Sequence, residues 1–192
     1  PDGKLLAAAA SDQTIHLFDW PAGQPHGQLL RGHTAAVEHV AFSPDGRWLA
    51  SAGDDNTVRF WRVADGQPDG APLIGHTDQV QDVAFSPDGR MLAATGNDGT
   101  VRLWDVASRQ PLGGALLSHR DIAYRLAFSG DGRQLVSGGL DGRVQVRPLD
   151  PAALRALACE RAGRNLTRAE WGLYVPDYAA YRSVCAAFPA AP

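Results

Sequence analysis

Short runs of alternating apolar and polar residues, separated by turn signals, cover most of residues 1–149. The run at 80–85, for example, has apolar residues at 80, 83 and 85, and the turn Pro87-Asp88-Gly89 follows it. Alternation of this kind is typical of strands, and the repeat has no apolar residues at helical spacing over ten or more positions. In this best-defined stretch the pattern predicts four short antiparallel strands, at 80–85, 91–95, 100–104 and 114–117.

The same unit returns every 43 residues, four times along the chain. Pro-Asp-Gly at 1–3 recurs at 44–46 and 87–89, and 12 of 18 positions are identical between 44–61 and 87–104. A period this regular indicates one structural unit copied in tandem. A four-stranded sheet of this size buries both faces only when neighbouring copies stack on it, so the repeat predicts the blades of a β-propeller.

The strands, counted against the period, divide the chain into blades. The sequence opens just after the place of a first strand, so we expect a partial blade at 1–31, whole blades at 32–74 and 75–117, and a partial blade at 118–149. The strands nearest the central axis are expected at 36–42, 80–85 and 122–128. The predicted fold class is therefore all-β, a β-propeller with a partial ring of about four blades.

Two interpretations of this open arc remain, because propellers close with roughly 4–8 blades. The chain is a fragment of a longer protein, or it is a natural short chain that completes its ring with a second copy. In the second case we expect self-association through the open propeller edges, since a terminal blade exposes its apolar side.

Several residues that recur in phase carry a family resemblance. Gly32-His33, Ser51, Asp55 and Trp61, together with Gly75-His76, Asp98 and Trp104-Asp105, resemble the signature of WD40 repeats over residues 1–149. The resemblance implies a hydrogen-bonded tetrad of His, Ser or Thr, Asp and Trp in each blade. Its members here are His33, Ser51, Asp55 and Trp61 in blade two, His76, Asp98 and Trp104 in blade three, and His119, Ser137 and Asp141 in blade four.

Three of the four tetrads are incomplete. Ala94 stands at the hydroxyl position of blade three, and Arg147 stands at the indole position of blade four. Blade one has only Asp12, with Ala8 and Phe18 at the other places. Because buried polar groups need partners, we expect the incomplete tetrads to stabilise their blades less.

The resemblance also implies where partners bind. In this family they often meet one end of the propeller, through the residues three and five positions after the blade histidine and the residue before the tetrad aspartate. These places hold Ala36, Ser11 and Ile122 and the candidate partner-binding residues Glu38, Asp54, Gln79, Gln81, Asn97, Tyr124 and Leu140. Tyr124 is the most similar to an interaction hot spot, because it is a large amphipathic ring. For each of them an ordinary solvated loop residue is the alternative interpretation.

The composition excludes some partners. With 18 Lys and Arg against 21 Asp and Glu, the formal net charge is −3, which argues against nucleic-acid binding. No apolar run approaches the roughly 20 residues that span a membrane, so we expect no membrane contact and a cytoplasmic location. Lys4 is the only lysine, and Ala, Gly and Pro are abundant, which favours a bacterial source.

No catalytic, cofactor or metal site is predicted. His33, His76 and His119 are 43 residues apart and so belong to separate blades, which argues against a shared metal ion. The repeat accounts for the Ser, His and Asp matches to catalytic sets, and no Walker-type glycine loop or kinase motif occurs. We therefore predict a non-catalytic interaction scaffold whose partner is a protein or peptide. A hydrolytic propeller is the enzymatic alternative, and the missing constellation argues against it.

The period breaks at Asp150, and residues 150–192 are predicted to form a short C-terminal helical tail of two helices. Asp150 is a good N-cap, Gly163 can end the first helix, and Thr167 with Glu170 forms a capping box for the second. Cys159 and Cys185 are either small buried apolar residues or a disulfide.

The stretch 159–171 resembles the tail that follows WD40 arrays in bacterial signalling proteins. That resemblance implies an alternative function, in which the chain is the C-terminal sensor or regulatory module of a larger signalling NTPase or protein kinase. The catalytic domain would then lie upstream of Pro1.

Overall fold

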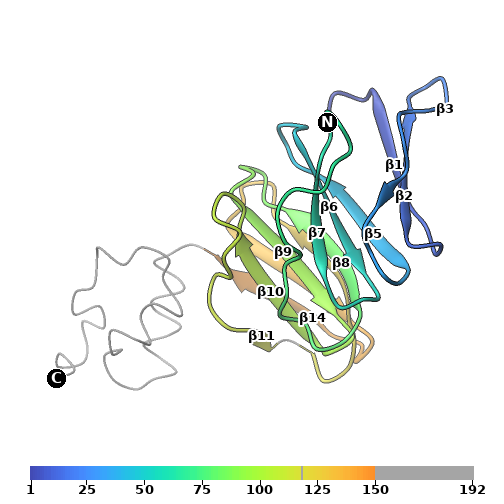
Figure 1. Ribbon diagram of the computed structural model, residues 1–192. Coiled ribbons are helices and arrows are strands. Elements are labelled where there is room, and N and C mark those ends of the chain that lie inside the picture. The colour runs from blue at the N-terminus through green and yellow to red at the C-terminus, as the bar shows by residue number, and fades with distance from the viewer. Residues whose placement is uncertain (118, 150–192) are drawn as a thin grey trace, which may run out of the picture.

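All the regular elements in the part of the chain that the computed structural model describes, residues 1–117 and 119–149, are β-strands. They form four antiparallel sheets that stack side by side as a partial β-propeller (Figure 1). The all-β prediction is thus confirmed for these residues. The predicted helical tail at 150–192, with Cys159 and Cys185, lies outside the described residues.

Blade one has no strand at the first position of the repeat. Its strands are β1 (Leu5–Ala9), β2 (Thr14–Asp19), and an outer strand in two pieces, β3 (Gln24–Pro25) and β4 (Leu30–Arg31), which both pair with β2. The register of the period predicts the missing first strand, but not the division of the outer strand into two pieces.

Blade two consists of β5 (Val37–Phe42), β6 (Trp48–Gly53) and β7 (Val58–Arg62). The expected fourth strand is reduced to two isolated bridges, between Val58 and Leu73 and between Trp61 and Pro68. Leu73 pairs as Leu116 of blade three does, but Ile74 does not pair as Leu117 does, so the outer strand is reduced to a single bridge there.

Blades three and four repeat this plan with a period of 43 residues. Blade three has a full set of four strands, β8 (Val80–Phe85), β9 (Met91–Gly96), β10 (Thr100–Asp105) and β11 (Leu116–Leu117). The described strands of blade four are β12 (Ala123–Phe128), β13 (Gln134–Gly139) and β14 (Val144–Pro148).

The first strands β5, β8 and β12 lie against one another, and each forms one edge of its own sheet. They coincide within one residue with the segments 36–42, 80–85 and 122–128 that the repeat predicts as inner strands. All three carry a β-bulge near the start, where the register shifts between Val37 and His39, Val80 and Asp82, and Ala123 and Arg125.

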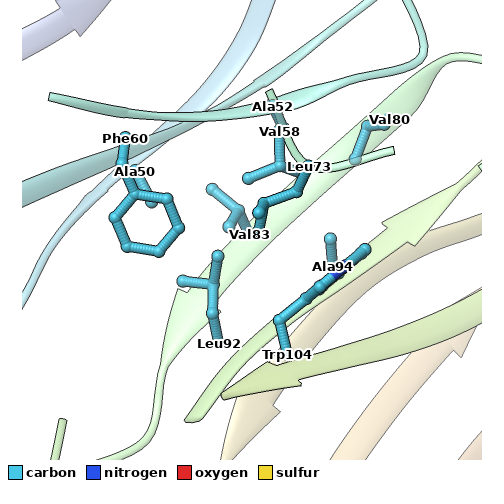
Figure 2. Close-up of a cluster of buried hydrophobic side chains, with 10 residues drawn as sticks. All are labelled: Ala50, Ala52, Val58, Phe60, Leu73, Val80, Val83, Leu92, Ala94 and Trp104. Atoms are coloured by element: carbon cyan, nitrogen blue, oxygen red, sulfur yellow. The ribbon is translucent and has the colours of Figure 1, made fainter. Parts of the chain in front are cut away.

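The core consists of three apolar clusters, one between each pair of neighbouring blades. Figure 2 shows the cluster between blades two and three, in which Val58 and Phe60 of β7 meet Val83, Leu92 and Trp104 of blade three. Such stacking supplies the cover that each small sheet needs on both faces, and it holds the loops at the ends of the blades in fixed positions.

Candidate interaction surface at one end of the propeller

In blade two, two side chains from strands and two from loops form one continuous chain of hydrogen bonds. His33 Nδ1 lies 2.9 Å from Asp55 Oδ2, and His33 Nε2 lies 2.6 Å from the Ser51 hydroxyl. The Trp61 indole N–H donates to the same hydroxyl at 2.9 Å. Ser51 therefore links the imidazole to the indole, and the four residues join the loop before β5 to β6 and β7.

The electrostatics of this chain keep the imidazole neutral. Burial lowers the pKa of His33, and the nearby Asp55 carboxylate offsets only part of that effect. Burial alone would raise the pKa of Asp55, but hydrogen bonds from Thr57 and the Thr34 amide outweigh it and lower the pKa. A neutral His33 then donates from Nδ1 to Asp55 and accepts from Ser51 at Nε2.

Blades three and four have shorter chains of the same kind. His76 Nδ1 lies 3.1 Å from both Asp98 carboxylate oxygens, but its buried Nε2 has no hydrogen-bond partner, because Ala94 replaces the serine. In blade four, His119 Nδ1 lies 3.0 Å from Asp141, and its Nε2 lies 2.9 Å from Ser137.

Beside each of these histidines stands a glycine that leaves room for the imidazole ring. The sequence analysis did not identify these three glycines. A Cβ at Gly53 would stand 2.5 Å from His33 Nδ1, one at Gly96 would stand 2.7 Å from His76 Nδ1, and one at Gly139 would stand 2.4 Å from His119 Nδ1. Each glycine thus leaves the space that the ring occupies. Their spacing of 43 residues in the sequence is the signal that points to them.

Backbone hydrogen bonds bring two loops together at the same end of each blade. The amide of Asp54 donates to the Ala36 carbonyl at 2.9 Å, and Asn97 donates to Gln79 at 2.8 Å. Leu140 donates to Ile122 at 2.9 Å in the same way. The residue before each tetrad aspartate therefore lies beside the start of an inner strand.

Three of the predicted partner-binding residues occupy the β-bulges. Glu38, Gln81 and Tyr124 fall within the register shifts of β5, β8 and β12, so they have no direct partner across the strand pair. A bulge bends its strand and re-aims the side chain of the extra residue. The regular alternation of the sequence gives no sign of this irregularity.

The comparison with family models agrees with this geometry. The model of the WD40 family, described as WD domain, G-beta repeat, matches residues 24–62, 70–105 and 112–146, together more than half of the chain. The chain belongs to the WD40 family. No curated protein matches it in sequence. WD40 repeats generally form scaffolds for protein–protein interaction.

The side chains at this end of the propeller differ in charge and in hydrogen bonding from one blade to the next. In blade two, Glu38 is exposed, and burial together with Asp55 and Asp78 raises the pKa of Asp54. In blade three, Asn97 Nδ2 donates to Gln79 Oε1 at 2.8 Å, so these two side chains are paired within the blade.

Among the predicted partner-binding residues, the two large side chains, Tyr124 and Leu140, both belong to blade four. Tyr124 is 42% exposed and Leu140 is 59% exposed. The Arg125 guanidinium carbon lies 4.5 Å from the centroid of the Tyr124 ring, and Arg125 also donates to the Gln81 carbonyl at 3.3 Å. This cation–π contact orders the tyrosine ring while leaving much of it open to solvent.

Within residues 1–117 and 119–149, no group of three or more His, Cys, Asp or Glu side chains is placed to hold a metal ion. The same part of the chain contains no helix with the length and apolarity needed to cross a membrane.

Proposed function

We propose that this chain is a non-catalytic scaffold that binds a protein or peptide at the end of the propeller where Glu38, Asp54, Gln79, Gln81, Asn97, Tyr124 and Leu140 lie. The observation that carries the proposal is the pair formed by Tyr124 and Leu140 in blade four. Both are large, more than 40% exposed, and held on a rigid stack of sheets.

The physical argument concerns the low entropic cost of binding. Tyr124 lies at a bulge beside Arg125, and the backbone amide of Leu140 is hydrogen-bonded to Ile122. Because both residues are already held in place, they lose little conformational entropy when a partner binds. Aromatic and apolar side chains that lie centrally in an interface supply most of its binding energy. The acidic residues of blade two and Arg125 of blade four would set orientation more than affinity.

The experiment measures binding of a partner captured by the tagged chain and identified by mass spectrometry. We expect Tyr124→Ala to raise the Kd about 30-fold, corresponding to about 2 kcal/mol for a hot spot. The matched control is Arg133→Ala, an exposed residue in the turn at the opposite end of β13. Unchanged affinity in both Tyr124→Ala and Leu140→Ala, with a loss in Arg133→Ala, would move the binding site to the other end.

A finer form of this function rests on the resemblance of residues 159–171 to the tail of bacterial signalling proteins. In that form the scaffold serves as a sensor or regulatory module beside an NTPase or kinase domain. The coding sequence upstream of Pro1 decides between the two forms, since a phosphate-binding loop or kinase motif there would support the second.

A further inference from the structure

The region where blades two and three meet, here called the seam, departs from the repeat at one turn. Residues 23, 66 and 109 are 43 positions apart, and their backbone is left-handed, with φ of 69°, 68° and 60°. The first two are glycines, whereas the third is Arg109. A left-handed backbone brings Cβ close to the following carbonyl oxygen, so arginine is strained here and glycine is not. Residues held in strained conformations cluster at binding sites, which makes the contacts of Arg109 a guide to function.

The Arg109 side chain reaches from blade three to blade two. Its guanidinium donates to Asp69 at 2.8 Å, and its central carbon lies 3.6 Å from the centroid of the Phe60 ring and 5.1 Å from that of the Trp48 ring. Phe60 belongs to the buried cluster drawn in Figure 2. Trp48 and Asp69 also depart from the repeat, since the same positions of blade three hold methionine and leucine. Three departures from the repeat thus meet at one point of the seam.

These side chains border a cleft of about 430 Å³. The residues that line it include Trp48, Asp69, Arg90, Asp105, Val106 and Arg109. Trp48 begins β6 and Arg90 directly precedes β9, so the cleft lies at the end of the blades opposite to the loops of the tetrads. The seam is in the middle of the arc, because blade one packs on blade two and blade four packs on blade three.

The charges in the cleft are paired except at Arg90. Asp69 is bound by Arg109 at 2.8 Å, and Asp105 accepts hydrogen bonds from the amide and the hydroxyl of Ser108, both at 2.7 Å. The Arg90 side chain is exposed, and its guanidinium forms no hydrogen bond or salt bridge with the described residues. The cleft therefore combines an aromatic wall with one unpaired cation.

We propose that this cleft binds a peptide segment in which an acidic residue stands close to a large apolar one. The apolar side chain packs against the indole of Trp48, since aromatic residues in partly enclosed sites supply much of the binding energy of an interface. The carboxylate of the peptide pairs with Arg90, because hydrogen bonds between a guanidinium and a carboxylate are among the strongest in proteins. Arg47, whose guanidinium carbon is 6.0 Å from the centroid of the Trp48 ring, adds a second cation nearby.

Arg109 is a positioning residue in this proposal. By pairing with Asp69 it neutralises a carboxylate that would otherwise repel an acidic ligand from the cleft. The strained backbone at this turn is then the cost of bringing a cation across the seam. The site is distinct from the surface that carries Tyr124, so one chain can hold two partners at opposite ends of its blades.

Fluorescence anisotropy of labelled peptides added to the whole chain tests the proposal. The probes are short, acetylated and amidated peptides in which aspartate precedes phenylalanine directly or after one or two glycines. Their controls replace the aspartate by asparagine or the phenylalanine by alanine. We expect at least one probe to bind at least about 10-fold more tightly than both of its controls.

Variants of the chain place this binding in the cleft. Arg90→Gln should raise the Kd of the best probe about 10-fold, whereas Arg133→Gln, at the same position of the repeat in blade four, should leave it unchanged. Arg109→Asn should also weaken binding about 10-fold, because it frees the charge of Asp69, and asparagine tolerates the left-handed backbone. Adding Asp69→Asn should recover most of that loss, which a chain that had merely unfolded could not do. Tyr124→Ala should leave the Kd unchanged, so the result is independent of the proposed function.

Four results would overturn the proposal. The first is that no probe binds at about 1 mM peptide. The second is that an asparagine or alanine control binds as tightly as its probe, and the third is that Arg90→Gln and Arg133→Gln have equal effects. The fourth is displacement of the probe by ATP at a lower concentration than by unlabelled peptide, which would assign the cleft to a phosphate ligand.

Discussion

Substitution Ala94→Ser should repair the incomplete tetrad of blade three and stabilise the protein. The imidazole and indole are already placed as in the complete tetrad. The ring centroids of His76 and Trp104 are 6.0 Å apart at 49°, and those of His33 and Trp61 are 6.2 Å apart at 47°. Because the ring geometry is the same, a hydroxyl at position 94 would reach His76 Nε2 as Ser51 reaches His33 Nε2.

The magnitude follows from the hydrogen bonds gained. His76 Nε2 is buried without a partner, so a new donor removes an unpaired group and adds one bond, with a net contribution of about 1 kcal/mol. For a chain of this size that corresponds to a rise in Tm of about 3 °C. The reverse change, Ser51→Ala, would leave His33 Nε2 and the Trp61 N–H without partners, at a cost of about 1–3 kcal/mol.

Urea unfolding at one fixed protein concentration, followed by tryptophan fluorescence, measures these changes. The matched control is Ala93→Ser on the neighbouring position of β9. Ala93 is 0% exposed and packs with Val101 and Leu135, so a hydroxyl there has no partner and should destabilise by about 1–3 kcal/mol. A loss of stability in Ala94→Ser equal to that of Ala93→Ser would refute the reasoning.

Two further predictions concern the histidines. Gly139→Ala would place a Cβ 2.4 Å from His119 Nδ1 and should lower the free energy of unfolding by about 1–3 kcal/mol. The control Gly138→Ala adds a Cβ with no atom within 4 Å and should change the free energy of unfolding little. Equal effects of the two substitutions in thermal melts would contradict this prediction. Stability should also fall as the pH drops below 6.5, because burial lowers the pKa of His33 and His76 and the unfolded chain then binds more protons. His39 affects the pH dependence of stability in the opposite direction, because its hydrogen bond to Asp82 raises its pKa. Its stabilising contribution is present below pH 6.5 and is lost as the pH rises through the raised pKa. His39→Gln should therefore lose more stability than the wild type between about pH 7 and 5.5, and a shallower loss in urea titrations would count against these assignments.

The period of the sequence predicts the strands because each blade repeats the same alternation and the same turns. Residues 80–85 and 100–104 coincide with β8 and with nearly all of β10 for this reason. The prediction of a fourth strand in blade two was wrong in extent, since Leu73 bridges Val58 but Ile74 does not pair as its counterparts Arg31 and Leu117 do.

The candidate surface was less accessible to sequence reasoning because it depends on irregular backbone and on contacts between loops. The bulges that re-aim Glu38, Gln81 and Tyr124 interrupt the ladder without changing the sequence pattern. Gln79 and Asn97 were both expected to be free for a partner, but they bond to each other across two loops. Only the three-dimensional approach of these loops reveals the pairing.

Site-specific photo-cross-linking tests most directly whether partners bind at the end of the propeller that carries Tyr124 and Leu140. A photoreactive amino acid replaces residue 124, 140 or 133 in the whole chain, and covalent capture of the partner is measured after irradiation. The proposed function predicts strong capture from positions 124 and 140 and little from position 133, which lies at the other end of β13. Capture from position 133 alone, or equal capture from all three positions, would contradict it.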